Sequence, residues 1–338
     1  MGIDLSVRKR KGFFVEKKAT LIVSLDFELF WGMQDGMTLE QYREHVLGGR
    51  AAVPKMLSLF EKHGIHATWA TVGFMFARDD EELRQYFPEE KALPTYANPA
   101  LSAYRCIEGA GITAEDAACY YAPEIIRSVA DTPGMEIASH TFSHFYCRED
   151  GQTVGQFEAD LDAARRIAKA QGYALGSLVL PRNQCEPAYT QSLQKLGFIA
   201  YRDEENDWIH EKIKIRPLMR LLRLADVYLP LTGQGGYLPK IECGVVNLTG
   251  SRMYKPFFKP LAALEWLKIR RIKRQMLHAA KHGLTFHLWW HPHNVGVHTD
   301  FHMAQLEEIF AYYEQLKERY GMRSLNMGEA AQEILKGT

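Results

Sequence analysis

The stretch ATLIVSLDFE, residues 19–28, gives the strongest indication of the fold of this chain. Its first seven residues are mostly apolar or β-branched, which is typical of a strand buried on both faces of a parallel sheet. Asp26 and Glu28 stand at its end. Side chains two apart on a strand point the same way, so both carboxylates are expected on one side of the strand's carboxyl end. Active sites are built at that end, although two surface carboxylates are the simpler alternative.

Strands and helices alternate outward from this stretch. We expect strands at 19–25, 67–72, 135–139, 178–180, 198–201 and 284–290, and helices at 51–63, 122–130, 154–171, 187–196, 301–320 and 327–335. Such alternation predicts an α/β architecture with a parallel sheet. With 338 residues, 46% of them hydrophobic, the chain suits one barrel of about 250 residues with extensions. Residues 1–338 are therefore predicted to form a single catalytic domain.

The range 209–282 differs in charge from the rest of the chain. It holds fifteen Lys or Arg against four Asp or Glu, whereas the whole chain has a formal net charge of zero. Two basic helices are expected in it, at 216–223 and 262–282. We predict a basic insertion before the last barrel strand, whose cations meet phosphates or an anionic membrane surface. A charged, solvated insertion that packs on the barrel is the alternative.

The cysteines and the termini bear on the compartment. Five cysteines without a C-x-x-C spacing indicate reduced thiols and favour a cytoplasmic protein. The basic N-terminus precedes an apolar stretch that is too short for a signal peptide. No segment reaches the roughly 18–20 apolar residues that span a bilayer. The zero net charge gives no reason to expect nucleic acid as a partner.

Two histidines follow the expected strand at 135–139. His140 and His144 are four residues apart, a spacing that places both imidazoles on one face of a helical turn. Two imidazoles and one carboxylate are a common zinc ligand set that leaves positions open for water and substrate. A helix start with one capping and one exposed histidine is the alternative.

Further polar groups stand at other strand ends. Arg182 follows the strand at 178–180, where a guanidinium can keep a carboxylate ionised, unless it is an ordinary surface arginine. His291 ends the strand at 284–290 and suits a general acid. His293 lies in the loop beyond, and His287 is expected to be a satisfied core histidine. Tryptophan rings can form a wall of a sugar-binding site, and core packing is the equally expected alternative. The candidates are Trp31, Trp208, Trp289 and Trp290.

Taken in order, five segments resemble the motifs of the polysaccharide deacetylases, the NodB-type carbohydrate esterases. The resemblance covers roughly residues 19–208 and 283–333. It implies a distorted (β/α) barrel of the NodB type and a metal-dependent amide hydrolase. The usual second aspartate of the first motif is Phe27 here, so its metal role is assigned to Glu28. The segments are 24–28, 139–144, 181–184, 204–208 and 289–294.

The resemblance implies a role for each matching residue. Asp26 is the catalytic base, Arg182 orients it and His291 is the catalytic acid, while Glu28, His140 and His144 hold a divalent metal. Zn2+ is expected, with Mn2+, Co2+, Ni2+ and Fe2+ as alternatives. The expected substrate-binding residues are Trp31, Asn183, Asp207, Trp208, Trp290 and His293.

The expected reaction is removal of an N-acyl group, in particular N-acetyl, from an amino sugar. A cytosolic, nucleotide- or lipid-linked intermediate of surface polysaccharide biosynthesis is the expected substrate, with peripheral contact to the inner membrane surface as an option. A cyclic-amide or formamide hydrolase on the same barrel is the first alternative. A non-catalytic saccharide-binding protein is the second, and a scaffold role through 209–282 is the third.

Overall fold

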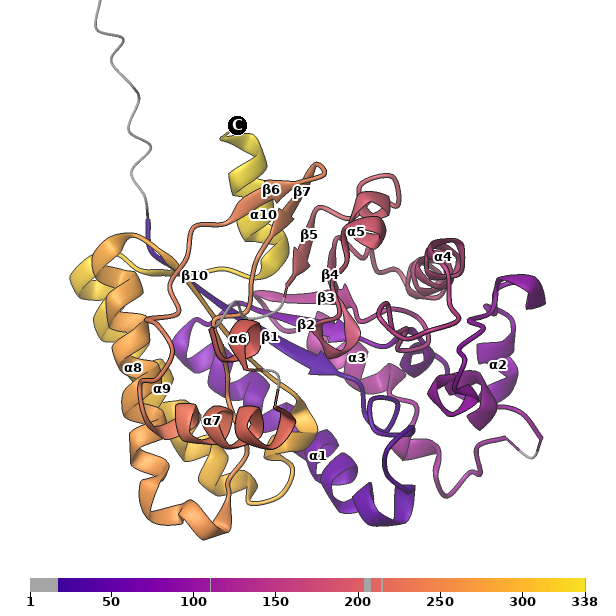
Figure 1. The fold of residues 1–338 in the computed structure, drawn as a ribbon, viewed down its shortest axis with the longest axis horizontal. Coiled ribbons are helices and arrows are strands. Elements are labelled where there is room, and N and C mark those ends of the chain that lie inside the picture. Colours follow the sequence, from indigo (N-terminus) through magenta and orange to yellow (C-terminus); the bar gives the residue numbers. More distant parts are fainter. Residues whose placement is uncertain (1–17, 110, 204–207, 214, 338) are drawn as a thin grey trace, which may run out of the picture.

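The computed structural model describes residues 18–109, 111–203, 208–213 and 215–337. Within them the strands form one ten-stranded sheet in the order β6-β7-β5-β4-β3-β2-β1-β9-β8, with β10 paired to β1 (Figure 1). Each printed strand pair is parallel except β6 with β7. The strands are β1 Thr20–Phe27, β2 Ala67–Thr71, β3 Met135–Ser139, β4 Ser177–Val179, β5 Ala200–Arg202, β6 Lys240–Glu242, β7 Val245–Asn247, β8 Arg252–Met253, β9 Thr285–Trp290 and β10 Arg323–Ser324.

The two sides of the sheet meet through residues 245–254. Early in this segment Leu248 N donates to Tyr201 O beside β5 at 2.8 Å, and later Tyr254 N donates to Trp289 O of β9 at 2.8 Å. The same stretch of backbone therefore borders β5 first and β9 afterwards. The sheet curls into a distorted barrel, and the predicted α/β fold class is confirmed.

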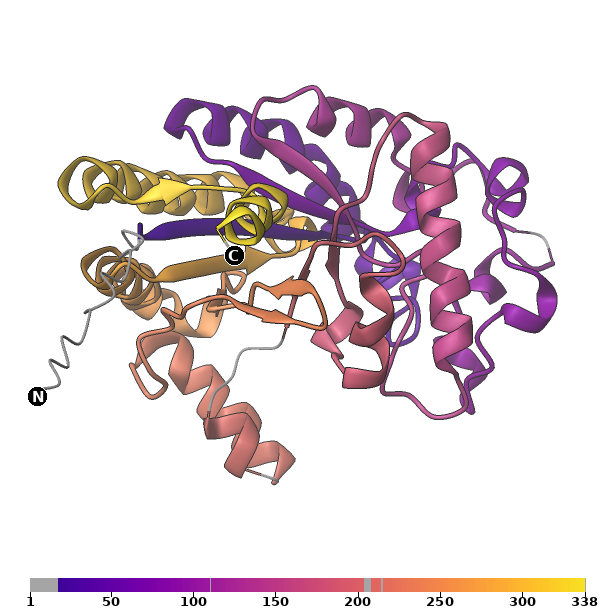
Figure 2. The same ribbon diagram turned by 90° about the horizontal axis from the view of Figure 1, so that it is seen from above.

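Helices surround the curled sheet (Figures 1 and 2). Capping boxes begin three of them, at Thr38, Thr153 and Asn326, which satisfies backbone donors that have no partner within the helix. The α-helices are α1 Leu39–His63, α2 Asp80–Arg84, α3 Pro123–Ala130, α4 Val154–Ala170, α5 Pro187–Leu193, α6 Trp208–Lys212, α7 Arg216–Tyr228, α8 Glu265–His282, α9 Thr299–Tyr320 and α10 Met327–Lys336.

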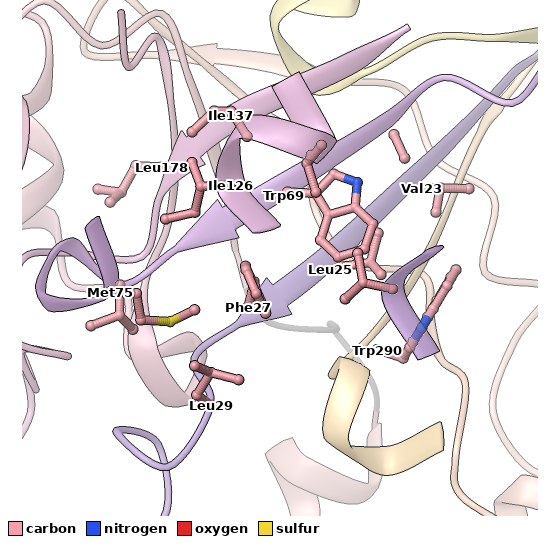
Figure 3. Close-up of a cluster of buried hydrophobic side chains, with 14 of the residues drawn as sticks. Val23, Leu25, Phe27, Leu29, Trp69, Met75, Ile126, Ile137, Leu178 and Trp290 are labelled. Carbon is pink, nitrogen blue, oxygen red and sulfur yellow. The ribbon is translucent and has the colours of Figure 1, made fainter. Parts of the chain in front are cut away.

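Strand β1 is buried on both faces, as its composition predicted. Its outward residues, Val23, Leu25 and Phe27 among them, join the large core under the helices (Figure 3). Its inward residue Ile22 joins a smaller cluster inside the sheet that α10 covers with Met327. The start of α10 also bonds near the amino ends of β2 and β3, through Thr68 and Glu136. One end of the barrel is thus closed by packing, and the polar groups gather at the other.

Helix α1 begins twelve residues before the expected start at Ala51. The sequence did not predict the first half of this helix because it contains Gly48 and Gly49. A glycine in a helix interior lowers helix stability by about 1 kcal/mol relative to alanine. Here the two glycines allow close packing against η8, a 3-10 helix at Pro292–Val295. A Cβ at Gly49 would stand 2.6 Å from His293 Cα. The glycines therefore let α1 support the segment that follows His291.

The basic range 209–282 contains part of the sheet. It was expected as an insertion before the last barrel strand, yet β6, β7 and β8 all lie in it and join the ten-stranded sheet. Helix α7 stands beyond the carboxyl ends of the strands, and α8 packs beside α9 (Figures 1 and 2). The α6–α7 region therefore lies outside the sheet, while the later part of the range contributes three strands to it.

Candidate active site

Asp26 and Glu28 lie on the same side of the chain at the end of β1, as predicted. Both are buried, each with 4% of its surface exposed. Gly32 leaves room for the Glu28 carboxylate, because a Cβ at position 32 would stand 2.1 Å from Glu28 Cδ. Carboxylates so deeply buried require cationic or hydrogen-bonding partners. Histidines and an arginine provide them.

The segment 140–144 is a loop, so the expected helical turn is wrong. Thr141 has φ 64° and His144 φ 59°, in the left-handed region. Buried Asp160 of α4 holds the loop by accepting hydrogen bonds from the backbone N–H groups of Phe142 at 2.6 Å and Ser143 at 3.2 Å. The two imidazoles still converge, because this strained loop brings them together where a helical turn was expected to.

Glu28, His140 and His144 form a compact group with ligand atoms all within 4.8 Å of one another. Nε2 of His140 is 3.2 Å and Nε2 of His144 is 3.0 Å from the same Glu28 oxygen, Oε2. Ligands that share one tetrahedral ion at about 2.0–2.1 Å are separated by about 3.3 Å. The spacing and the donor types therefore fit a divalent metal ion.

The partners of the imidazoles also fit a metal. His140 Nδ1 lies 2.8 Å from the carbonyl oxygen of Val179, and His144 Nδ1 lies 3.1 Å from the Tyr146 hydroxyl. A carbonyl oxygen only accepts, so His140 carries its proton on Nδ1 and presents a lone pair on Nε2. Such bonds fix the tautomer and orientation of metal-binding histidines.

Arg202, at the end of β5, holds Asp26. Its Nη1 and Nη2 each donate to one oxygen of the Asp26 carboxylate at 2.7 Å. Arg182 was expected in this role, and that prediction is wrong: Arg182 pairs with Asp35 and with Glu149 and stacks on Tyr146. Arg202 was not among the predicted site residues. It could have been, because it stands at the carboxyl end of a strand, as Asp26 does.

Arg202 is itself held on several sides. Asn183 Oδ1 accepts from its Nη2 at 2.9 Å, and Ser24 Oγ accepts from its Nη1 at 2.9 Å. The Trp289 ring lies 4.2 Å from the guanidinium carbon. His287 bonds Ser24 at 2.7 Å and the Leu248 carbonyl at 3.0 Å, so it is the buried, satisfied histidine that was expected. Asn183 thus contacts the arginine that holds Asp26.

Both carboxylates are favoured in their ionised form. Burial raises the pKa of Asp26, but Arg202 and nearby histidines outweigh it and hold that pKa below its usual value. Burial likewise opposes ionisation of Glu28, and His291, His140 and His144 bring its pKa well below the ordinary range. An ionised Asp26 can accept a proton, and an ionised Glu28 can bind a cation.

His291 and His293 complete the group. His291 Nε2 stands 3.6 Å from Asp26 Oδ2 and 3.6 Å from Glu28 Oε1. His293 is stacked on it, with ring centroids 5.0 Å apart. Burial and the neighbouring His291 lower the pKa of His293 to about 3. His291 is the more exposed of the two and faces the cavity.

The predicted aromatic wall is wrong for two tryptophans, and for Trp208 it stays a prediction. Trp31 is buried and donates to the Tyr120 carbonyl, and Trp290 is buried against Phe60. Trp208 is 39% exposed and donates to the Leu231 carbonyl. Asp207 lies outside the described residues.

These groups line one cavity of about 870 Å³. Asp26, Glu28 and His144 stand in one wall, with Asn183, Arg182, Trp289, His291 and His293 around them. The facing wall comes from α7, α8 and the segment between β8 and α8. A volume of this size is within the range of small-molecule binding sites.

Fold and site together define a class of proteins, the hydrolases that use a divalent ion at the mouth of an α/β barrel. The family model described as polysaccharide deacetylase matches residues 38–201, a little under half of the chain. Members of that family are metal-dependent hydrolases of amide bonds. The matched range includes His140 and His144, whereas Asp26, Glu28 and His291 lie outside it.

Solved structures show the same fold. A Mycobacterium smegmatis protein assigned as a polysaccharide deacetylase is 15% identical, with a TM-score of 0.61 over 96% of this chain and 93% of that one. PuuE allantoinase is 13% identical, with a TM-score of 0.57 over 94% and 91%. A probable polysaccharide deacetylase from Pseudomonas aeruginosa PAO1 is 13% identical, with a TM-score of 0.55 over 95% and 92%. A search of curated proteins found no match.

Proposed function

We propose that this protein hydrolyses the N-acetyl group of an amino sugar and releases acetate and a free amine. The observation that carries the proposal is the buried Glu28–His140–His144 group next to an Asp26 that Arg202 holds ionised. A metal group beside a separate, unprotonated acid is what hydrolysis of an amide by water requires.

We assign the metal site to Glu28, His140 and His144, with Zn2+ as the proposed ion because two imidazoles and one carboxylate suit it. When bound, such an ion supplies Lewis acidity toward a water molecule and the acyl oxygen. Mn2+, Co2+, Ni2+ and Fe2+ also accept imidazole ligands and remain alternatives.

The protein's own groups move the protons. Asp26 is the base that takes the proton of the attacking water, and Arg202 holds its carboxylate in place during that step. His291 is the acid that protonates the leaving amine, since its Nε2 lies 3.6 Å from the base and faces the cavity. His293 is the proposed support of the His291 ring through their stacking contact.

We further propose that the substrate is a cytosolic intermediate of surface polysaccharide biosynthesis. All five cysteines are free thiols in the structure, which suits a reducing compartment. Among the described residues, none of the helices combines the length and apolar character needed to cross a bilayer.

A peripheral membrane contact through α7 belongs to the same proposal. Ile215, Leu218 and Leu221 are 65%, 41% and 62% exposed, and they occupy the side of the helical segment opposite the residues that line the cavity. Arg216 is exposed on the same helix, and the one acid of α7, Asp226, is buried. A basic helix with exposed leucines is suited to an anionic lipid surface.

Vesicle sedimentation tests this contact. We expect binding to phosphatidylglycerol vesicles at low salt and none to phosphatidylcholine. The Leu218→Ser/Leu221→Ser variant should lose it, whereas Leu47→Ser, exposed on α1, should not. Absence of wild-type binding at low salt would remove the membrane from the proposal.

The alternative of a cyclic-amide or formamide hydrolase stays open, because PuuE allantoinase shares the fold. Product analysis separates the three reactions. Acetate supports deacetylation, whereas formate or a ring-opened product supports the alternatives.

The central experiment combines metal content with acetate release from N-acetylated saccharides. Glu28→Ala and His144→Ala should lose both metal and activity. Asp26→Asn should keep the metal and lose activity, because it removes only the base. His282→Ala, an exposed histidine at the end of α8, is the matched control and should behave as wild type. Full metal in Glu28→Ala together with metal loss in Asp26→Asn would reverse the assignment of the two acids.

A further inference from the structure

Asn183 offers an oriented hydrogen-bond donor in the wall of the cavity. Its Oδ1 accepts from two nitrogens of Arg202, from Nη2 at 2.9 Å and from Nε at 3.2 Å. A guanidinium group only donates, so the amide oxygen faces Arg202 and the amide nitrogen, Nδ2, is turned away from it. Asn183 lines the cavity, and within the described residues Nδ2 has no acceptor.

The turn that carries Asn183 uses neighbouring backbone donors for itself. Arg182 has φ 55° and Asn183 φ 49°, both in the left-handed region. The N–H of Asn183 donates to the Leu180 carbonyl at 2.9 Å, and that of Gln184 to the Pro181 carbonyl at 3.1 Å. Backbone in this region persists where its surroundings fix it, and it is frequent at ligand-binding sites. The side-chain amide is therefore the donor that this turn holds ready for a ligand.

This donor stands beside the proposed base. Nη2 of Arg202 donates to Asp26 Oδ2 at 2.7 Å as well as to Asn183 Oδ1 at 2.9 Å, so one nitrogen atom links the two side chains. Asp26 and Asn183 also line the same cavity, together with Glu28 and His144. A water molecule that gives its proton to Asp26 attacks a carbon next to it. The oxygen on that carbon is then close to the Asn183 amide.

Neighbouring donors of the cavity are differently placed. Arg182 is engaged by two carboxylates. Nε1 of Trp289 is buried. The Tyr42 ring packs against His293, with ring centroids 5.4 Å apart, on the side of the proposed acid. Asn183 is thus the uncharged donor on the side of the base.

We propose that Nδ2 of Asn183 donates a hydrogen bond to the acyl oxygen of the substrate and stabilises the negative charge that forms there. As the water oxygen bonds to the acyl carbon, its proton passes to Asp26 and the carbonyl π pair moves onto the acyl oxygen. When the carbon–nitrogen bond breaks, that pair re-forms the carbonyl and His291 protonates the amine. A donor fixed in advance stabilises the charge without having to reorient.

This role rests on the proposed function for the reaction, and it applies to an N-acetyl and to an N-formyl group alike. It adds one residue to the reacting centre and gives that residue a stated atom. The acceptor of Asn183, Oδ1, holds Arg202, and the donor, Nδ2, serves the substrate. The two halves of one side chain can therefore be tested separately.

Two substitutions separate the donor from the acceptor. Asn183→Ala removes both, whereas Asn183→Asp removes the donor and keeps an oxygen for Arg202. We expect each to lower kcat by about 100-fold or more with KM within about 3-fold of wild type and with unchanged metal content. The same two changes at Asn98 are the controls. That residue is exposed and its Oδ1 accepts from the Ala100 N–H at 3.1 Å, so both variants should behave as wild type.

A binding measurement tests the donor without turnover. Methylphosphonate is a tetrahedral anion with the shape of the acyl group after water has added to it. Calorimetry with the zinc-loaded protein should show one site, and Asn183→Ala should weaken the binding by about 10-fold or more because a hydrogen bond to a charged group is lost. Asn98→Ala should change it by less than about 2-fold. If no N-acyl sugar is turned over, the proposed function fails and this measurement still decides the role of Asn183.

Three results overturn the proposal. Wild-type kcat in Asn183→Asp would leave Asn183 as a support of Arg202 alone. A higher KM with unchanged kcat in both Asn183 variants would assign the amide to another part of the substrate. Methylphosphonate binding that is absent from wild type, or equally strong in Asn183→Ala, would show that no such donor acts on a tetrahedral anion.

Discussion

At the scale of single residues, the base depends on an arginine from a distant strand. Arg202 is fully buried and lies 176 positions from Asp26 in sequence, yet its two terminal nitrogens match the two carboxylate oxygens. A lysine can supply the charge but not the paired geometry. The orientation of Asp26 is therefore a property of this guanidinium.

Arg202→Lys is predicted to lower kcat for acetate release by about 100-fold, because a misplaced base slows the proton transfer from water. Metal content should stay at the wild-type level, because Arg202 does not contact the metal group. Arg182→Lys is the matched control, since that arginine contacts Asp35 and Glu149. A large loss in Arg182→Lys with none in Arg202→Lys would restore the original assignment.

Gly32→Ala is predicted to displace Glu28, because the new methyl group would occupy the position of its carboxylate. The expected outcome is metal loss in equilibrium dialysis, with affinity lower by about 10-fold or more when one ligand moves. Gly36→Ala, in the same loop with nothing within 4 Å of the added atom, is the control. Equal metal affinity in the two variants would contradict the prediction.

Residue identity in the metal group was predictable from sequence, since Glu28, His140 and His144 stand directly after apolar strands. The partner of Asp26 was not, because nothing in a sequence says which of two strand-end arginines reaches a given carboxylate. The curl of the sheet decides it by bringing β5 toward β1 across the interior. The predictions that Trp31 and Trp290 line the site were wrong for a related reason. Both side chains point to the outer core, and the residue type alone does not reveal this direction.

At the scale of elements, the loop at 140–144 depends on one buried acid of α4. Burial raises the pKa of Asp160 to about 6, even though it accepts hydrogen bonds from Ser143 and Phe142. The folded state therefore binds a proton more tightly at this group than the unfolded chain does. The contribution of Asp160 to stability is fully present below the unfolded pKa and is lost as pH rises toward about 6.

The predicted consequence is a pH-dependent gap between wild type and Asp160→Asn. Between about pH 4.5 and about pH 7.5 the free energy of unfolding of wild type should fall by about 2 kcal/mol relative to the variant, which cannot titrate. Urea unfolding at the two pH values measures the gap. A gap that stays constant, or that widens in favour of wild type as pH rises, would contradict it.

Elements with a clear apolar period were predictable, such as α4 and β9. The first half of α1 was not, because its glycines serve packing against η8 and carry no helical signal. Strands β6 to β8 are two or three residues long, too short for alternation to show. Their pairing depends on β5 and β9, which lie elsewhere in the sequence.

At the scale of the whole molecule, stability and chemistry occupy opposite ends of the barrel. Met327→Ala removes a fully buried side chain from the cluster under α10, and we predict a loss of about 2–4 kcal/mol in urea unfolding. Metal affinity of the folded variant should stay unchanged. Met37→Ala, at a 36% exposed position, should cost less than about 0.5 kcal/mol. A loss of metal affinity in Met327→Ala would show that the two ends are coupled.

The chain leaves the sheet after β5 and re-enters it at β6, whose antiparallel partner β7 lies beside β5. Everything that α6 and α7 contribute to the cavity therefore lies on one connection, between β5 and β6. This connection takes no part in the pairing of β1 and β3, the strands that precede Glu28 and His140. One wall of the cavity and the candidate metal group are therefore carried by separate parts of the chain.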